Sequence, residues 1–164
     1  MTDSKNISEF SDEFDLTDDR EKFVTMFISG QMFGIPVLDV QDVLGPQRLT
    51  WVPLAPPDVA GVLNLRGRIV TAIDVRKRLG ISAADEEQDS MSIVVEHGEE
   101  LYSLIVDSVG EVLNLRSDAR ERGPATLDPL WKEVSSGIYR LDETLMVVLD
   151  VSKLLNFTDT EIAA

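Results

Sequence analysis

Short apolar runs separated by turn-forming residues recur along most of the chain. Many contain β-branched or aromatic residues, and the intervening segments carry glycine or charged residues. Ser29-Gly30-Gln31 and Arg66-Gly67 are two such turns, the second inside a hairpin. The pattern predicts strands at residues 23–28, 32–35, 62–65, 69–73, 91–96, 101–106, 110–115, 137–141 and 145–149. Many short strands predict an all-β barrel or sandwich.

Helices are predicted only as short pieces. Pro36 can start a helical turn through Val40, with residues 41–45 extended after it. Asp74 and Asp150 each precede a short apolar stretch, as helix N-caps do, so we expect helices at 75–79 and 151–155. Residues 51–57 hold three prolines and form a stiff connector, and residues 58–61 form at most one helical turn.

The chain also resembles itself. At an offset of 76, residues 61–79 align without a gap on residues 137–155, with six of the nineteen positions identical. At an offset of 69, residues 33–44 align on residues 102–113. Two matched segments in the same order imply a duplicated supersecondary unit, hence two similar barrels.

Length and composition fit one domain, or two small intertwined ones, of 164 residues with 43% apolar side chains. Cysteine is absent, which removes disulfides and thiolate metal sites. The acidic N-terminus is unlike a secretory signal, and the longest apolar runs are far shorter than a membrane span. We therefore expect a cytoplasmic protein with no direct membrane insertion.

The formal charge of −15 argues against nucleic acid or anionic lipid as partners. Residues 1–21 hold eight acids against Lys5 and Arg20, lack sustained periodicity and are predicted to be a disordered acidic tail. A second acidic stretch, at 82–90, is predicted to be a loop. The segment from Arg66 to Arg78 is instead basic. It is either a local docking face or a set of solvated turns.

Motifs for catalysis are missing. The sequence has no G-x-G, no Walker lysine loop and no G-x-S-x-G, so nucleotide and acyl-transfer signatures are absent. The single histidine, His97, lies beside Gly98 in a predicted hairpin turn. Asp74 and Asp150 fit N-capping better than an acid–base pair. We expect neither an enzyme nor a bound cofactor or metal.

One central segment is family-specific. Pro53-x-x-Pro56, then G-V-L-N-L-R-G-R-I-V at 61–70 and I-D-V-R at 73–76, resembles the signature of CheW-like domains. The resemblance covers about residues 22–157. It implies two intertwined five-stranded SH3-like β-barrels with short helices, and no catalysis. It also implies two partners, the cytoplasmic tip of a chemoreceptor and the regulatory domain of the histidine kinase CheA.

The same resemblance implies a receptor-binding groove between the barrels. In this picture an apolar floor accepts a helix, a glycine permits close approach, and an arginine binds carboxylates or helix carbonyls. The residues carried over by motif position are Val40, Asp42, Gly61, Arg66, Met91 and Val112. Two alternatives stay open: Arg66 as a solvated turn residue, and Val40 and Val112 as ordinary core. Asp42 and Thr71 depart from the family's usual Glu and Pro.

We therefore expect a tail at residues 1–21, a CheW-like domain at 22–157 and a short C-terminal tail at 158–164. The expected function is a chemotaxis adaptor that couples methyl-accepting chemoreceptors to CheA. The alternatives are an adaptor of a non-flagellar chemosensory pathway, a regulatory piece of a multidomain signalling protein, and a catalytic barrel.

Overall fold

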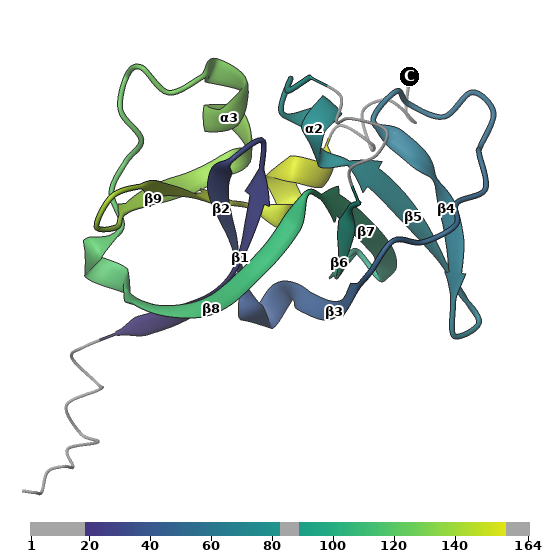
Figure 1. Cartoon of the computed structure of the whole chain (residues 1–164), viewed down its shortest axis with the longest axis horizontal. Coiled ribbons are helices and arrows are strands. Elements are labelled where there is room, and N and C mark those ends of the chain that lie inside the picture. The colour runs from purple at the N-terminus through teal and green to yellow at the C-terminus, as the bar shows by residue number, and fades with distance from the viewer. Residues whose placement is uncertain (1–18, 83–88, 157–164) are drawn as a thin grey trace, which may run out of the picture.

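A computed structural model describes residues 19–82 and 89–156 of the chain. Within these residues, ten strands form two five-stranded sheets, and the helices between them are short (Figure 1). The all-β fold class expected from the sequence is confirmed. The strands are β1 (Arg20–Ile28), β2 (Gln31–Pro36), β3 (Val40–Leu44), β4 (Val59–Leu65), β5 (Arg68–Asp74), β6 (Met91–His97), β7 (Glu100–Val106), β8 (Ser108–Arg116), β9 (Ser135–Arg140) and β10 (Leu145–Leu149).

The two sheets are intertwined because the chain leaves the first sheet and later returns to it. The first sheet has the order β8-β1-β2-β10-β9, and the second has the order β3-β6-β7-β5-β4. Each sheet therefore combines strands from both halves of the sequence. Four pairings in each sheet link neighbouring strands, and in each sheet one of them, β2 with β10 or β5 with β7, is parallel.

The repeat at an offset of 76 is present in the strand pairing itself. In the β4–β5 hairpin Gly61 faces Ala72, and in the β9–β10 hairpin Gly137 faces Val148, which are the same positions plus 76. A register shift lies directly before each glycine, between Val59 and Gly61 in β4 and between Ser135 and Gly137 in β9. Equivalent spacing of the side chains has thus produced the same hairpin twice.

The repeat at an offset of 69 relates β1, β2 and β3 to β6, β7 and β8. Met26 of β1 pairs with Val109, and the equivalent Val95 of β6 pairs with Val40. The first sheet therefore contains β1 and β2 of the first repeat together with β8 of the second. The second sheet contains β6 and β7 of the second repeat together with β3 of the first. Because the two repeats are equivalent, as the duplication in the sequence predicted, the exchange of strands is reciprocal.

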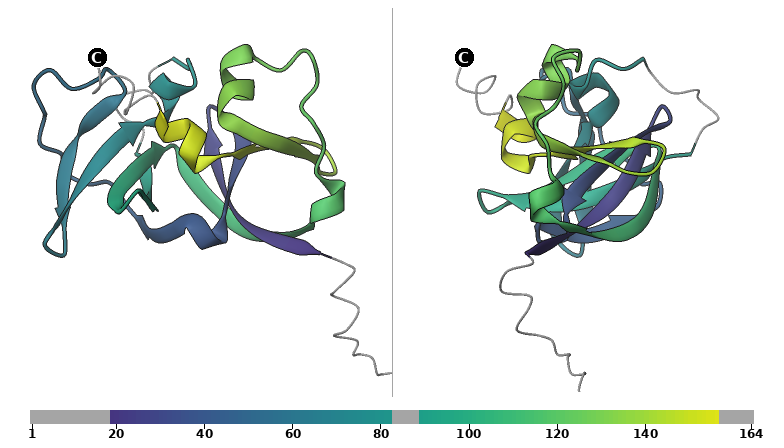
Figure 2. Two further views of the ribbon diagram at one scale, coloured as in Figure 1. Left: turned by 180° about the vertical axis from the view of Figure 1, so that it is seen from behind. Right: turned by 90° about the vertical axis from the view of Figure 1, so that its left-hand side faces the viewer.

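One large apolar cluster joins the sheets. It includes Phe33 and Ile35 from the first sheet with Ile93 and Leu104 from the second, all without exposed surface. The short helices are η3 (Val37–Asp39), α2 (Val75–Arg78), η4 (Ser117–Ala119), α3 (Pro129–Val134) and helical residues 151–156. Of these, α2, α3 and residues 151–156 lie together on one side of the molecule, and η3 lies on the opposite side, next to β3 (Figure 1 and Figure 2).

The predicted N-caps are confirmed. The Lys77 backbone N–H donates to the Asp74 carboxylate, and the Lys153 N–H donates to Asp150. Thr71 lies inside the sheet, facing Val62 on one side and Tyr102 on the other. A strand in the interior of a sheet uses its backbone N–H groups as hydrogen-bond donors to its neighbours. Thr71 keeps this N–H, which a proline at the same position would lack.

Some local predictions were wrong. Residues 59–61 belong to β4 rather than to a helical turn, because the chain reverses at Pro56 and then pairs with β5. Arg20 and Glu21, assigned to the tail, begin β1 by pairing with β8. The pattern gave no element for α3, although Asp128 caps it and Pro129 opens it. Residues 1–18, 83–88 and 157–164 lie outside the described residues. They include most of the predicted acidic loop, the N-terminal tail up to residue 18 and the whole predicted C-terminal tail.

Candidate partner-binding site

Two of the six predicted site residues are in direct contact. Arg66 Nη2 donates to Asp42 Oδ2 at 2.8 Å, across the two edge strands of the second sheet, β3 and β4. The Arg66 side chain stays 74% exposed, whereas that of Asp42 is 27% exposed. The pair therefore fixes the guanidinium at a hairpin tip without hiding it from a partner.

The surrounding backbone holds both members of this pair in place. Arg66 has a positive φ of 52°, and the turn is closed by the Gly67 N–H, which donates to Asn64 Oδ1 at 3.0 Å. Asp42 Oδ1 accepts from the Val43 N–H at 2.8 Å. The hydrogen bond from Arg66, with that from Val43, lowers the pKa of Asp42. The shorter Asp side chain thus reaches its partner.

Packing within the chain itself requires a glycine at position 61. It lies buried in β4 with φ at 152°, and a Cβ there would come within 2.7 Å of the Thr50 carbonyl oxygen. Thr50 and Val62 also exchange backbone hydrogen bonds of 2.8 and 2.9 Å. The close approach that Gly61 permits is therefore made by the connector before β4, which positions the hairpin that carries Arg66.

The remaining three residues lie apart from one another. Val40 and Met91 are half-buried against the large core cluster, Val40 at the start of β3 and Met91 at the start of β6. Val112 lies on β8 of the first sheet and is 52% exposed. The alternative of ordinary core therefore holds in part for Val40, whereas Val112 presents its side chain to solvent. Met91 packs against the same core cluster as Val40.

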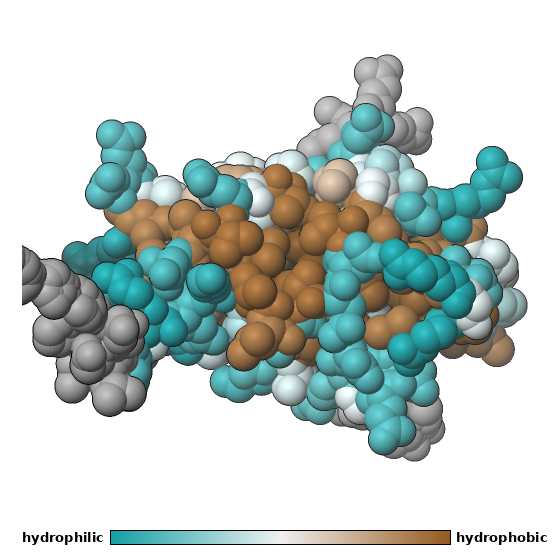
Figure 3. Space-filling model, turned by 90° about the horizontal axis from the view of Figure 1, so that it is seen from below, coloured by the Kyte–Doolittle hydropathy of each residue, from teal (hydrophilic) through white to brown (hydrophobic). Residues whose placement is uncertain are grey.

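An apolar band crosses the face that holds β8, η3 and β3. Figure 3 views this face from below and shows brown side chains across its middle, bordered by hydrophilic ones. The exposed apolar residues of these elements are Leu38, Val43 and Val112, at 92%, 38% and 52% exposure. Leu38 and Val43 were missed as site residues. Their neighbours Val40 and Asp42 were predicted as site residues, but alternation in such short elements does not show which side faces solvent.

The basic stretch does not act as one docking face. Arg76 binds the Asp107 carboxylate through Nε at 2.9 Å and Nη2 at 2.6 Å, with both side chains nearly buried. Arg78 Nε donates to the Leu154 carbonyl at 2.9 Å. Arg66, Arg68 and Lys77 remain exposed. Two members of the stretch therefore have structural roles, which sequence spacing alone could not indicate.

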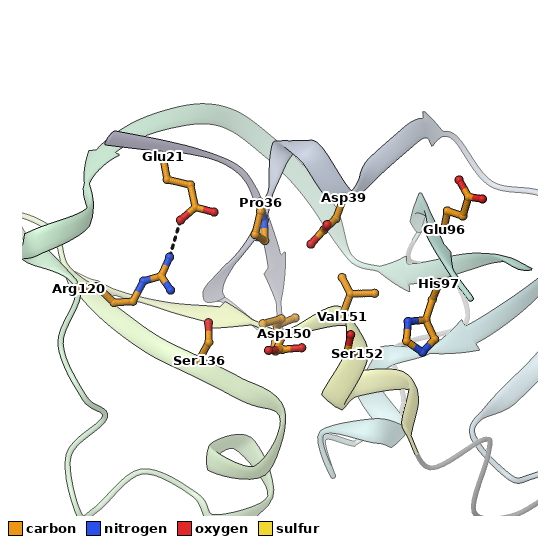
Figure 4. A pocket seen from close by; sticks show the side chains of 11 residues that line it. Glu21, Pro36, Asp39, Glu96, His97, Arg120, Ser136, Asp150, Val151 and Ser152 are labelled. Carbon is orange, nitrogen blue, oxygen red and sulfur yellow. Dashed lines mark hydrogen bonds and ion pairs between the residues drawn. The ribbon is translucent and has the colours of Figure 1, made fainter. Parts of the chain in front are cut away.

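A hollow of about 280 Å³ lies where the two sheets meet (Figure 4). The carboxylates that line it, of Glu21, Asp39, Glu96 and Asp150, come from separate elements. Glu21 forms an ion pair with Arg120, with 2.7 Å between Glu21 Oε1 and Arg120 Nη2. Burial, with nearby Asp150 and Glu21, raises the pKa of Asp39. His97 lines the same hollow.

Across residues 19–82 and 89–156, no group of three or more His, Cys, Asp or Glu residues is placed so that it could hold a metal ion. None of the helices in that part is long and apolar enough to cross a membrane.

Comparison with known proteins gives a consistent result. The family model of the CheW-like domain matches residues 22–159. A chemotaxis protein CheW from Klebsiella aerogenes is 29% identical over 136 residues, covering 83% of this chain and 82% of that protein. The CheW of Thermotoga maritima is 30% identical, covering 78% and 83% respectively. The crystal structure of a scaffolding CheW from Thermoanaerobacter tengcongensis superposes with a TM-score of 0.74 at 30% identity, over 82% of this chain and 92% of the other.

Proposed function

The chain belongs to the CheW-like domain family, and we propose that it couples methyl-accepting chemoreceptors to the histidine kinase CheA in the cytoplasm. Family and relatives make it a chemotaxis scaffold protein. Since these are scaffolds, the prediction that the chain is not an enzyme is confirmed.

The observation that carries the proposal is the charged hairpin tip formed by Arg66 and Asp42, next to the apolar band of Leu38, Val43 and Val112. A helix presents an apolar stripe with polar residues on either side, so it fits a surface of this composition. Asp42 and Val43 are consecutive residues of the edge strand β3, so the ion pair and the apolar band share this strand. The receptor tip is a helical coiled coil by family resemblance, and we assign it to this face.

The six predicted residues then act in different ways. Arg66 contacts the receptor, and Asp42 orients it. Val112 contributes apolar contact area. Val40 and Met91 pack against the large core cluster and so hold β3 and β6 in place. Gly61 acts indirectly, because it lets the connector cross β4 and so fixes the hairpin. We expect the kinase regulatory domain to bind a different face of the molecule from the receptor tip.

The test is titration of a receptor-tip fragment and, separately, of the kinase regulatory domain against Arg66→Glu. A lost charge-assisted hydrogen bond weakens receptor binding by roughly 10- to 150-fold. Kinase binding changes much less. Arg68→Glu is the matched control, because Arg68 is an exposed arginine two positions further along the same hairpin.

A charge swap separates direct contact from orientation. If Arg66 only braces its own hairpin, Asp42→Arg combined with Arg66→Glu restores receptor affinity, since the ion pair is rebuilt in reverse. Direct contact predicts that affinity stays low in the double variant. Unchanged affinity of Arg66→Glu, or an equal loss in Arg68→Glu, contradicts the assignment.

The alternative function is that of an adaptor in a non-flagellar chemosensory pathway. Both curated relatives described above are named chemotaxis proteins, so this alternative is not favoured. Reconstitution with candidate kinases and receptors distinguishes the two, because an adaptor raises receptor-controlled kinase activity only with its own partners.

A further inference from the structure

A second hollow, of about 290 Å³, lies between the start of β1 and the helical turn η3. We call it the β1–η3 hollow. The two elements are in contact, and β1 is the first element of the described chain (Figure 1). The hollow therefore lies at the point where residues 1–18 join the fold. The residues that line it are Arg20, Glu21, Lys22, Pro36, Val37 and Leu38.

The two walls of the β1–η3 hollow differ in chemistry. The wall formed by η3 and the end of β2 is apolar and includes Leu38, which is 92% exposed and belongs to the apolar band. The wall formed by β1 carries Arg20 and Lys22, which are both exposed and lie two positions apart, on one face of the strand. Glu21, which also lines the hollow, already forms an ion pair with Arg120. The hollow therefore suits apolar side chains that have carboxylates beside them.

The volume of the hollow limits its occupant to a few side chains. A cavity of about 150 Å³ is enough to hold a benzene ring, so a hollow of about 290 Å³ can hold a phenylalanine ring and a further apolar side chain. An α-helix, about 10 Å across, is too wide to enter a hollow of this volume. The occupant is therefore a short segment of chain, whereas a receptor helix can only lie across the hollow's rim at Leu38.

The N-terminal segment, residues 1–18, has the chemistry that the hollow requires. It contains six acidic residues and a single lysine, together with the apolar residues Phe14 and Leu16 near its end. Its attachment point is fixed, because the Asp19 carbonyl accepts a hydrogen bond from the Ser117 N–H at 2.9 Å. The segment thus joins the fold directly beside the hollow, and its apolar side chains and carboxylates match the two walls.

Phe14 and Leu16 are close enough in sequence to return to the hollow. Thr17, Asp18 and Asp19 are of residue types that favour turns, and a four-residue turn from Leu16 to Asp19 brings its ends within about 7 Å of each other. In an extended segment, Phe14 lies on the same side as Leu16, two positions later. One turn therefore presents both side chains to the same wall.

The other strongly exposed apolar side chains that lie outside the band are farther from this attachment point. Trp51, Leu54 and Ile69 belong to the connector before β4 and to β5, at the other end of the molecule (Figure 1). Phe14 reaches at most about 18 Å from Asp19, even when the residues between them are fully extended. The β1–η3 hollow, which begins one residue after Asp19, lies well within this reach.

We propose that residues 1–18 fold back into the β1–η3 hollow and compete there with the receptor tip. Phe14 and Leu16 pack against the apolar wall beside Leu38, and the neighbouring carboxylates face the two cations of β1. The competition rests on the proposed function, which assigns the apolar band containing Leu38 to the receptor helix. The receptor must displace the segment first, so its apparent affinity falls with the fraction of chains whose hollow is open. The contact is therefore autoinhibitory.

Docking of the segment is tested without any receptor, by NMR on the full chain labelled with ¹³C and ¹⁵N. The salt concentration is kept low, because screening is then weak. Nuclear Overhauser effects connect the ring protons of Phe14 to the methyl groups of Leu38. In the double variant Phe14→Ser/Leu16→Ser, the amide signals of Val37 and Leu38 move from their wild-type positions.

The matched control is Ile7→Ser/Phe10→Ser, which removes two apolar side chains farther from Asp19 and leaves the net charge unchanged. It keeps the amide signals of η3 at their wild-type positions. Titration with a receptor-tip fragment then measures the competition. Phe14→Ser/Leu16→Ser binds the fragment about 2- to 10-fold more tightly than the wild type, as expected if half to nine-tenths of wild-type chains have the hollow filled. The control binds the fragment as the wild type does.

The outcomes separate this proposal from the proposed function. Absence of the contact between Phe14 and Leu38 overturns the proposal, whatever the receptor affinity is. A contact without a gain in receptor affinity, or an equal gain in both double variants, overturns the competition. Failure of the proposed function appears instead as unchanged receptor affinity in Arg66→Glu, and the NMR contact does not depend on it. Circular dichroism melting of each variant verifies that the fold is retained.

Discussion

Gly61 and Gly137 occupy the same position in the two repeats and have the same two constraints. Their φ angles are 152° and 140°, a region that side chains with a Cβ rarely adopt. A Cβ at Gly61 would meet the Thr50 carbonyl oxygen at 2.7 Å, and one at Gly137 would meet Arg120 Cγ at 2.8 Å. Each glycine allows a connector to cross its hairpin.

We expect Gly61→Ala and Gly137→Ala each to lower the free energy of unfolding by about 1–3 kcal/mol, because strain and steric overlap add. Chemical denaturation measures this change. Gly45→Ala is the control, since a Cβ there would meet no atom within 4 Å and its φ is not positive. A loss at Gly61 no larger than that at Gly45 would show that the connector moves aside freely.

At the scale of elements, one ion pair ties together parts of both sheets. Asp107, between β7 and β8, binds Arg76 of α2 through both carboxylate oxygens. The same carboxylate accepts from the Ser29 N–H, in the turn between β1 and β2, at 2.7 Å. A helix of the second sheet and a hairpin of the first are thus held by one side chain.

Removing one member of this pair leaves a charge with little solvent around it. Arg76→Gln should therefore destabilise the fold by up to about 3–5 kcal/mol. Arg116→Gln breaks the exposed Arg116–Asp118 pair of equal length, 2.6 Å, and should cost at most about 1 kcal/mol. Thermal unfolding compares the two, and similar losses would refute the structural role of Arg76.

At the scale of the whole molecule, the shared core predicts one cooperative unit. Ile73 and Leu149 are repeat equivalents, and both are fully buried in the cluster that joins the sheets. Ile73→Ala or Leu149→Ala should cost about 2–5 kcal/mol, the usual range for such cavities.

Both variants should unfold in a single transition whether followed by circular dichroism or by tryptophan fluorescence, because neither sheet can lose its strands without the other. Val62→Ala is a control at a half-buried site and should cost less. Two separate transitions, each moved by only one of the variants, would mean that the sheets unfold independently.

The sequence by itself determined the short elements and the duplication. Strand residues such as Val147 and caps such as Asp74 are specified by side chains close to them in the chain, so local pattern predicts them well. The 76-residue offset predicted the twin hairpins because equivalent side chains need equivalent pairing. The family motif at 61–70 likewise indicated the scaffold function and drew attention to Arg66.

Only the tertiary structure decided which distant segments meet. The exchange of β3 and β8 between repeats depends on the free energy of the whole assembled core, and either arrangement satisfies the same local pattern. Tertiary contacts also gave different roles to arginines that look alike in sequence. Arg76 forms a nearly buried ion pair with Asp107, Arg66 is exposed at a hairpin tip beside Asp42, and Arg78 donates to the Leu154 carbonyl. A side chain's role depends on the burial and charges around it, and these come from residues tens of positions away.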